Sequence, residues 1–330
     1  MLNNHNKFGR LLAVSVTAAL AAVLLGLCLG STPLSPGQVL AGLLHKGGTE
    51  TAILWVVRLP RVAACALAGC ALAVSGLLLQ TATGNPLAGP NVIGVNAGAG
   101  FAMLLGLCFA PMAHRLQPLF CMVGAFAAAL VIVFTAQRVG GSKVTVVLCG
   151  VAVSALLNAA VSALKLLYPD LSVSYNAFSV GGVEGAAFED LLLPAMLTAA
   201  VMLAAALLGR RLDLLCLGDS LAVSLGVRVK PLRIFALLLA SVAAAAAVSF
   251  AGLLGFVGLM VPHMARALTG QGSMCRQLPI CALLGSSLVI LADLLGRVLF
   301  APSQLPAGIV TAVLGAPFFF VLLLQRRNRL

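Results

Sequence analysis

Long apolar runs repeat along almost the whole chain, and they constrain its fold more than any other feature. Of the 330 residues, 62% are hydrophobic and only 8% are charged, whereas a soluble domain has about a quarter charged residues. A helix needs about 20 apolar residues to cross the hydrocarbon core of a bilayer. The sequence therefore predicts an all-α, polytopic membrane protein with about ten transmembrane helices in one domain, 1–330. We expect the spans at 11–30, 62–80, 93–110, 119–136, 144–164, 191–208, 234–250, 252–267, 279–299 and 307–324.

The positive charges indicate how these spans are oriented. Lys and Arg gather in the cytoplasmic loops of membrane proteins, and the chain has 20 of them and a net charge of +12. With a cytoplasmic N-terminus, only six fall outside, namely Lys46, Arg58, Arg61, Arg115, Lys165 and Arg297. We therefore expect both termini in the cytoplasm. This topology explains the basic charge, so we expect membrane lipid and no nucleic acid among the partners.

The stretch 234–264 is almost unbroken apolar sequence. As one helix it would be about 46 Å long, well beyond a hydrocarbon core of roughly 30 Å. A single span would also place the basic C-terminus outside. We therefore predict two short spans that turn near Ser249–Gly252.

Two short basic motifs suggest an internal repeat. Arg58-Leu-Pro-Arg61 opens one span, and Lys230-Pro-Leu-Arg233 opens the span that comes five spans later. An odd offset gives the two copies opposite orientations, as an inverted repeat requires.

The sequence lacks the motifs of catalysis. It contains no G-x-x-x-x-G-K-[ST] phosphate loop and no HExxH zinc motif. His263 follows Pro262 near the end of a span, where a packing or capping role is favoured over metal ligation. We expect neither an intramembrane enzyme nor a metal site.

Asp293 is the main candidate for ion coupling. A secondary transporter needs ionisable groups near the middle of the membrane, and Asp293 lies inside the span 279–299. It is also four residues before Arg297, so the two side chains can pair on one helix face. A neutralised pair is favoured over an ion site, and an ion-coupled transporter is kept as the alternative function.

Arg58 and Arg61 lie three residues apart at the start of an extracellular span, which places them on one helix face. Guanidinium groups there suit two roles, contact with lipid headgroups or bidentate recognition of carboxylates on a partner protein. The residues alone leave both roles open.

The basic segment 209–233 is too short and polar to span the membrane. Its apolar residues recur at helical spacing, and Gly218 and Gly226 interrupt them. We predict one or two short helices on the cytoplasmic surface, with Gly226 ending a helix. These helices suit either a passive connector or a docking element for another subunit.

Taken in order, several motifs resemble those of the FecCD-type permeases, membrane subunits of bacterial importers for iron–siderophore chelates, haem and cobalamin. The resemblance covers nearly the whole chain. It is carried by Arg58-Leu-Pro-Arg61, Ser75-Gly76 to Gln80, Asn85-Pro86-Leu87-Ala88, Gly94-Val95, Gly98-Ala99, Leu217-Gly218-Asp219 with Ala222 and Gly226, Gly255 to Pro262-His263, Ala292-Asp293, Leu305-Pro306 with Gly308 and Thr311, and Gly315-Ala316-Pro317.

The resemblance implies an assembly in the bacterial cell membrane. A second copy of the same permease would complete the substrate pathway, and a cytoplasmic ABC ATPase dimer would supply the energy. ATP and magnesium would bind to that ATPase, and this chain would bind no cofactor. An extracellular or periplasmic solute-binding protein would deliver the substrate.

The resemblance also implies roles for individual residues. Arg58, Arg61 and Arg297 would face acidic residues of the binding protein, and the segment 209–233 would couple to the ATPase through Asp219, Ala222 and Gly226. A cytoplasmic gate is expected near Ser142 and Lys143. The remaining matched residues are expected to shape the structure or the pathway: Asn85, Pro86, Pro262, His263, Asp293, Pro306 and Gly308.

The chain departs from the family pattern at several positions. Gly89 replaces the usual acidic residue after Asn85-Pro86-Leu87-Ala88, and Gln304 replaces a frequent Glu. The spans consist mostly of Ala, Gly, Leu and Val, whose side chains offer no polar contacts to a substrate. This suggests that substrate selectivity resides mainly in the binding protein.

Overall fold

A computed structural model describes residues 2–30, 32–44, 48–112, 114–140, 142–270 and 273–327. Within these residues the chain is helical and has no β-strand. The main helices are α1 (Leu2–Cys28), α2 (Pro36–Leu44), α3 (Thr49–Ala52), α4 (Leu59–Thr83), α5 (Val95–Phe109), α6 (Gln117–Arg138), α7 (Lys143–Leu167), α8 (Leu171–Val180), α9 (Phe188–Leu207), α10 (Gly209–Leu215), α11 (Asp219–Ser224), α12 (Val229–Ala251), α13 (Val257–Thr269), α14 (Met274–Val298) and α15 (Ala307–Arg327). The prediction of an all-α fold is confirmed for these residues.

Seven helical segments of the described chain are long and apolar enough to cross a bilayer. They lie in α1, α4 with the π-helical turn Ile53–Arg58 before it, α6, α7, α9, α12 and α14. The apolar helices at Val95–Phe109 and Ala307–Leu322 are shorter, and α13 has 13 residues. A helix therefore overlaps each of the ten expected spans, while the number of spans that cross the membrane stays a prediction.

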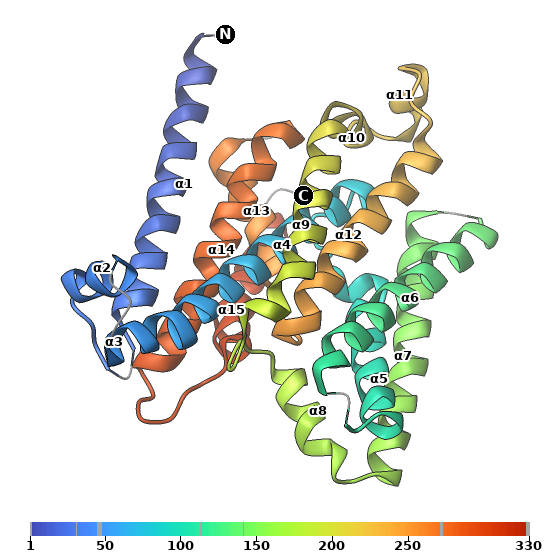
Figure 1. Cartoon of the computed structure of the whole chain (residues 1–330). Coiled ribbons are helices and arrows are strands. Elements are labelled where there is room, and N and C mark those ends of the chain that lie inside the picture. The colour runs from blue at the N-terminus through green and yellow to red at the C-terminus, as the bar shows by residue number, and fades with distance from the viewer. Residues whose placement is uncertain are drawn as a thin grey trace.

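Helix α4 forms the centre of the bundle. It packs against α12, α13 and α14, and every residue from Ala71 to Thr83 is buried. Its residues are mostly small or apolar on all sides, as expected of a helix that is enclosed by others. The helices α10 and α11 lie at the same end of the bundle as the N-terminus, whereas α2, α3 and α8 lie at the opposite end (Figure 1).

Glycines allow α4 to approach its neighbours closely. A Cβ on Gly69 would overlap the carbonyl oxygen of Gly285 in α14. A Cβ on Gly76 would overlap the carbonyl oxygen of Gly258 in α13. Small residues at such crossings let the backbones touch, which is how membrane helices gain packing energy.

The long apolar stretch breaks where the sequence predicts it. Helix α12 ends at Ala251, Gly252 has a φ of +62°, and α13 begins at Val257. Phe256, immediately before α13, has a φ of +63°, a conformation that is uncommon for a bulky residue. The break at Ser249–Gly252 is confirmed, but α13 is too short to cross the bilayer by itself.

Main-chain hydrogen bonds join three distant segments beside this break. Gly182 N–H donates to Ala251 O at 3.0 Å, and Leu253 N–H donates to Phe178 O at 3.1 Å. Gly308 N–H, in the first turn of α15, donates to Gly181 O at 3.0 Å. We call this contact of the end of α8, the break after α12 and the start of α15 the backbone junction.

Candidate functional site

A buried ion pair joins α4 to α14 near the end of the bundle where α8 lies. Arg61 donates from Nε to both carboxylate oxygens of Asp293 at 3.1 Å, and from Nη2 to Oδ1 at 2.9 Å. The Asp293 side chain is only 2% exposed and that of Arg61 is 10% exposed. The three hydrogen bonds use one edge of the guanidinium group, as bidentate pairs do.

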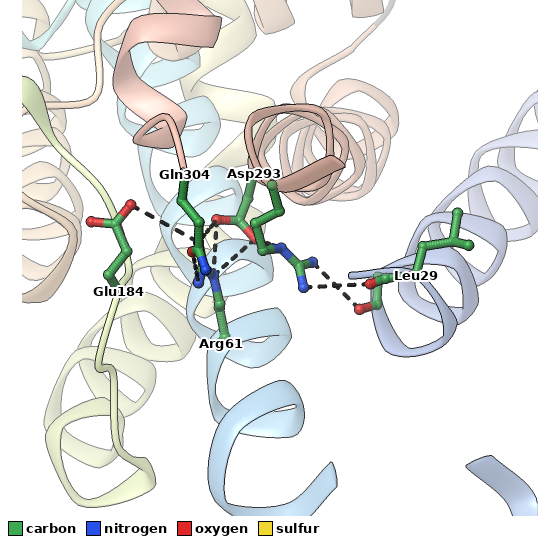
Figure 2. Close-up of polar contacts among 7 residues, drawn as sticks. Leu29, Arg61, Glu184, Asp293 and Gln304 are labelled. Carbon is green, nitrogen blue, oxygen red and sulfur yellow. Dashed lines mark hydrogen bonds and ion pairs between the residues drawn. The ribbon is translucent and has the colours of Figure 1, made fainter. Parts of the chain in front are cut away.

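Arg297 approaches the same carboxylate from one turn along α14. Its Nε lies 3.0 Å from Asp293 Oδ2, and its Nη atoms reach the carbonyl oxygens of Gly26 and Leu29 at 3.4 and 3.5 Å. The predicted pairing of Asp293 with Arg297 on one helix face is confirmed. Asp293 pairs with Arg61 (Figure 2) and also with Arg297, so its charge is compensated inside the chain.

Two further residues complete this charge cluster, which we define as Arg61, Glu184, Asp293, Arg297 and Gln304. Arg61 Nη1 donates to Gln304 Oε1 at 2.8 Å, and Arg61 Nη2 lies 3.9 Å from Glu184 Oε1. Burial raises the pKa of the Glu184 carboxyl, and the Arg61 guanidinium opposes this shift. The cluster thus draws on α4, α14, the loop before α9 and the loop before α15.

Arg58 makes its hydrogen bonds outside this cluster. Its guanidinium donates to the carbonyl oxygens of Leu27, Cys28 and Thr32 at the end of α1. Both Arg58 and Arg61 are buried in the single chain. The end of α1 covers Arg58 and α14 covers Arg61. Docking to a binding protein stays a prediction for Arg58, Arg61 and Arg297.

At the opposite end of the bundle, the segment 209–233 contains the two short helices α10 and α11, as predicted. Ala222 is fully buried. After α11, Val227 N–H donates to Ala222 O and Gly226 N–H donates to Val223 O, and Gly226 has a φ of +81°. This is the Schellman arrangement in which glycine ends a helix, and it confirms the predicted role of Gly226 in the backbone.

Arg233 connects this segment to the centre of the bundle. Its Nη2 donates to Asp219 Oδ1 at 2.6 Å, and its Nε donates to Ala82 O at the end of α4 at 3.0 Å. The Arg233 side chain is 7% exposed. One buried guanidinium therefore ties α11, α12 and α4 together.

Asp213 provides a second tie. Its carboxylate accepts a hydrogen bond from Met274 N at 2.6 Å, at the first turn of α14. A negative charge at a helix N-terminus is favourable. Burial raises the pKa of Asp213, and the hydrogen bond from Met274 opposes that shift.

The matched motif before α5 forms a turn. Asn85 Oδ1 accepts from Leu87 N at 3.0 Å, with Pro86 between them. This side-chain turn follows Gly84, which has a φ of +61° at the end of α4. The Asn85-Pro86 motif therefore has a local structural explanation.

The other matched residues lie in α7, α13 and α15. Ser142 caps α7 by accepting from Thr145 N at 3.1 Å, and the side chain of Lys143 lies outside the described part of the chain. Pro262 lies inside α13, and the His263 ring packs edge-on against Phe318 of α15, with centroids 5.9 Å apart. Packing of His263 agrees with its expected role. Pro306 O accepts from Ile309 N in the first turn of α15, and Gly308 is part of the backbone junction.

Sequence reasoning did not assign functions to Glu184, Arg233 or Gln304. A signal existed for each. Arg233 ends the motif that repeats Arg58-Leu-Pro-Arg61, Glu184 lies in an acidic gap, and Gln304 departs from the family pattern. None of these signals identifies a partner, because the contacts join segments far apart in the sequence.

Comparisons with known proteins match the chain almost from end to end. The family model described as the FecCD transport family matches residues 18–325. The achromobactin transport system permease protein CbrC of Dickeya dadantii is 40% identical over 98% of this chain and 94% of its own. The hemin transport system permease protein HmuU of Yersinia pestis is 37% identical over 94% of this chain and 95% of its own.

A solved structure supports the same relationship. It shows a putative metal-chelate type ABC transporter in an inward-facing conformation, and its chain matches with a TM-score of 0.83 and 28% sequence identity. The match covers 96% of this chain and 99% of the other.

Proposed function

The chain belongs to the FecCD transport family, and we propose that it is the membrane permease subunit of an ATP-binding-cassette importer. Its cargo would be an iron chelate, either a siderophore complex or haem. The observation that carries this proposal is the end-to-end match to permease proteins for achromobactin and hemin. The two relatives give no support to a cobalamin-like cargo, which rests on the sequence resemblance alone.

We propose that all ten helices that overlap the expected spans form the membrane domain. Seven are long enough to cross by themselves, and α5, α13 and α15 would complete the bundle as shorter elements. The positive charges favour a cytoplasmic location for both termini and for α10 and α11. The end of the bundle that carries the charge cluster would then face outward, in the bacterial cell membrane.

The permease would work in a larger assembly. We propose a second permease copy, a cytoplasmic ATPase dimer that binds ATP and magnesium, and an external solute-binding protein. Exposed apolar side chains on α7, including Leu148, Val151 and Leu156, are available for lipid or for the second copy. The helices α10 and α11 would contact the ATPase, with Asp219, Ala222 and Gly226 in the segment that transmits its motion.

The contacts of Asp293 argue against ion-coupled transport. A coupling carboxylate must exchange an ion or a proton during each cycle. Asp293 is instead held by Arg61 and Arg297 at 2.9–3.1 Å. Energy supplied by nucleotide hydrolysis on another subunit fits this arrangement better.

The test is uptake by proteoliposomes that contain the permease, its ATPase and its binding protein. Ferric siderophore or haem uptake should require ATP and should persist when a protonophore collapses the ion gradient. A complex with a hydrolysis-deficient ATPase is the matched control and should show no uptake. Uptake that continues with this ATPase but stops with the protonophore would establish the ion-coupled alternative.

A further inference from the structure

The guanidinium group of Arg61 has two edges that can each donate a pair of hydrogen bonds, and different side chains of the protein occupy them. The edge formed by Nε and Nη2 carries the hydrogen bonds to Asp293. The edge formed by Nη1 and Nη2 faces Gln304 Oε1 at 2.8 Å and Glu184 Oε1 at 3.9 Å. Figure 2 shows Glu184 on the side of Arg61 away from Leu29.

The contact between Arg61 and Glu184 is weak. A separation of 3.9 Å exceeds hydrogen-bond distance, and the Glu184 side chain is 44% exposed while that of Asp293 is 2% exposed. Burial raises the pKa of Glu184 although Arg61 lies nearby, which agrees with a pair that compensates its desolvation only in part. Glu184 therefore loses little by turning into the solvent.

The loop that carries Glu184 has a fixed base. Gly182 N–H donates to Ala251 O at 3.0 Å, and Ala186 N–H donates to Val183 O at 3.3 Å. Val183 is buried, whereas Glu184 and Gly185 are exposed. The side chain of Glu184 can therefore change its direction while the backbone on either side stays in place.

We propose that Glu184 is an internal competitor for the binding protein: it occupies the edge of Arg61 to which a carboxylate of that protein binds. This inference rests on the proposed function. An incoming carboxylate can make two parallel hydrogen bonds to the Nη1–Nη2 edge, which requires Glu184 and Gln304 to move aside. Asp293 remains on the other edge and keeps Arg61 oriented.

Charge favours this exchange. Without Glu184, the cluster retains the two cations Arg61 and Arg297 against the single carboxylate of Asp293. Arg58 lies beside Arg297, and the two positive charges repel each other. An acidic partner surface would replace the missing negative charge. Complementary charges of this kind mainly speed association and fix the register of two proteins.

The test compares Glu184→Gln with Glu189→Gln in the permease–ATPase complex held in lipid nanodiscs. Glu189 is the matched control, because it is an exposed glutamate in the first turn of α9, directly after the loop that carries Glu184. The measurement is the Kd of the solute-binding protein at low ionic strength. Glu184→Gln should tighten docking about two- to fivefold, the range of a weak surface ion pair, and Glu189→Gln should leave it unchanged.

The outcomes separate this inference from the proposed function. If wild-type protein docks and Glu184→Gln gives the same Kd, Glu184 does not compete, although the importer assignment stands. Weaker docking by Glu184→Gln would show that Glu184 is itself a docking contact, which also overturns the inference. Absence of docking by the wild-type complex would overturn both. A melting curve of each variant complex confirms that the comparison is between folded proteins.

Discussion

The carboxylate of Asp293 compensates two buried cations at once. It receives hydrogen bonds from Arg61, 232 residues away in the sequence, and forms an ion pair with Arg297 in its own helix. A charge inside a protein is costly unless it is paired, and removing one partner leaves the others uncompensated. At this position one substitution leaves two buried guanidinium groups without their counterion.

We expect Asp293→Asn to destabilise the folded permease by about 3–5 kcal/mol, because the neutral amide leaves Arg61 and Arg297 without a counterion. The measurement is the thermal unfolding of the purified protein in detergent. Asp170→Asn is the control, since Asp170 is exposed and forms no side-chain cap to α8. Equal melting temperatures for Asp293→Asn and the wild-type protein would contradict this view of the cluster.

Single residues were predictable from the sequence only where helical spacing sets the contact. The four-residue spacing of Asp293 and Arg297 predicts their pairing, and Gly226 was correctly expected to end a helix. Arg61 and Glu184 meet through tertiary packing, which no local pattern encodes. For the same reason, the burial of Arg58 beneath the end of α1 was not foreseen.

At the scale of the elements, α4 can pack closely against its neighbours because glycines without side chains lie where the helices cross. The backbone of α4 touches α14 at Gly69 and Gly285, and touches α13 at Gly76 and Gly258. In lipid, helices gain little from the hydrophobic effect, so close packing of this kind is a main source of association.

We expect Gly76→Ala to destabilise the fold by about 1–3 kcal/mol, the range for overpacking a well-packed core. The added Cβ would overlap the carbonyl oxygen of Gly258, so α4 and α13 must separate. Gly9→Ala is the matched control, since Gly9 is also helical and, outside its own helix backbone, no atom of the described residues lies within 4 Å of an added Cβ. Thermal unfolding measures both, and an equal effect of the two changes would show that the crossing at Gly76 tolerates a side chain.

Helices were predictable where the apolar runs are long. The sequence indicated the break at Ser249–Gly252 because a continuous helix would exceed the bilayer. No helix was predicted between the expected spans at 31–61 and 165–190, however, and these gaps include α2, α3 and α8. These helices have at most 10 residues, and α8 has no buried residue, so hydrophobic periodicity gives little signal for them.

On the scale of the whole molecule, charged side chains connect both ends of the central helix α4 to other helices. Arg61 is in the first turn of α4 and contacts Asp293, and Ala82 near its end accepts a hydrogen bond from Arg233, which also binds Asp219. A movement of α11 is thereby connected to α4, whose start carries the charge cluster. This physical path joins the proposed ATPase contact to the opposite end of the bundle.

We expect Arg233→Met to lower ATP-driven uptake about tenfold, within the usual range of coupling between distant sites, while the ATPase still co-purifies with the permease. The change removes the tie among α11, α12 and α4 but leaves the surface of α11 in place. Arg228→Met is the control, because Arg228 is exposed just before α12. Wild-type uptake by Arg233→Met would exclude this path.

The sequence predicted the class of the whole molecule well, since composition and ordered motifs both act over the entire chain. It could not predict how the ends of α4 are held. Arg61 and Arg233 were noticed as parts of similar motifs, but their carboxylate partners, Asp293 and Asp219, became apparent only from the packed helices.

The backbone junction has a consequence for the diversification of such proteins. Its bonds run from Gly182, Leu253 and Gly308 amides to main-chain oxygens, so they do not depend on the chemistry of neighbouring side chains. The three segments must nevertheless touch, because a Cβ on Gly181, Gly252 or Gly308 would lie 1.8–2.6 Å from a main-chain oxygen of another segment. Such proteins can therefore diversify elsewhere along the chain, but not at these three glycines.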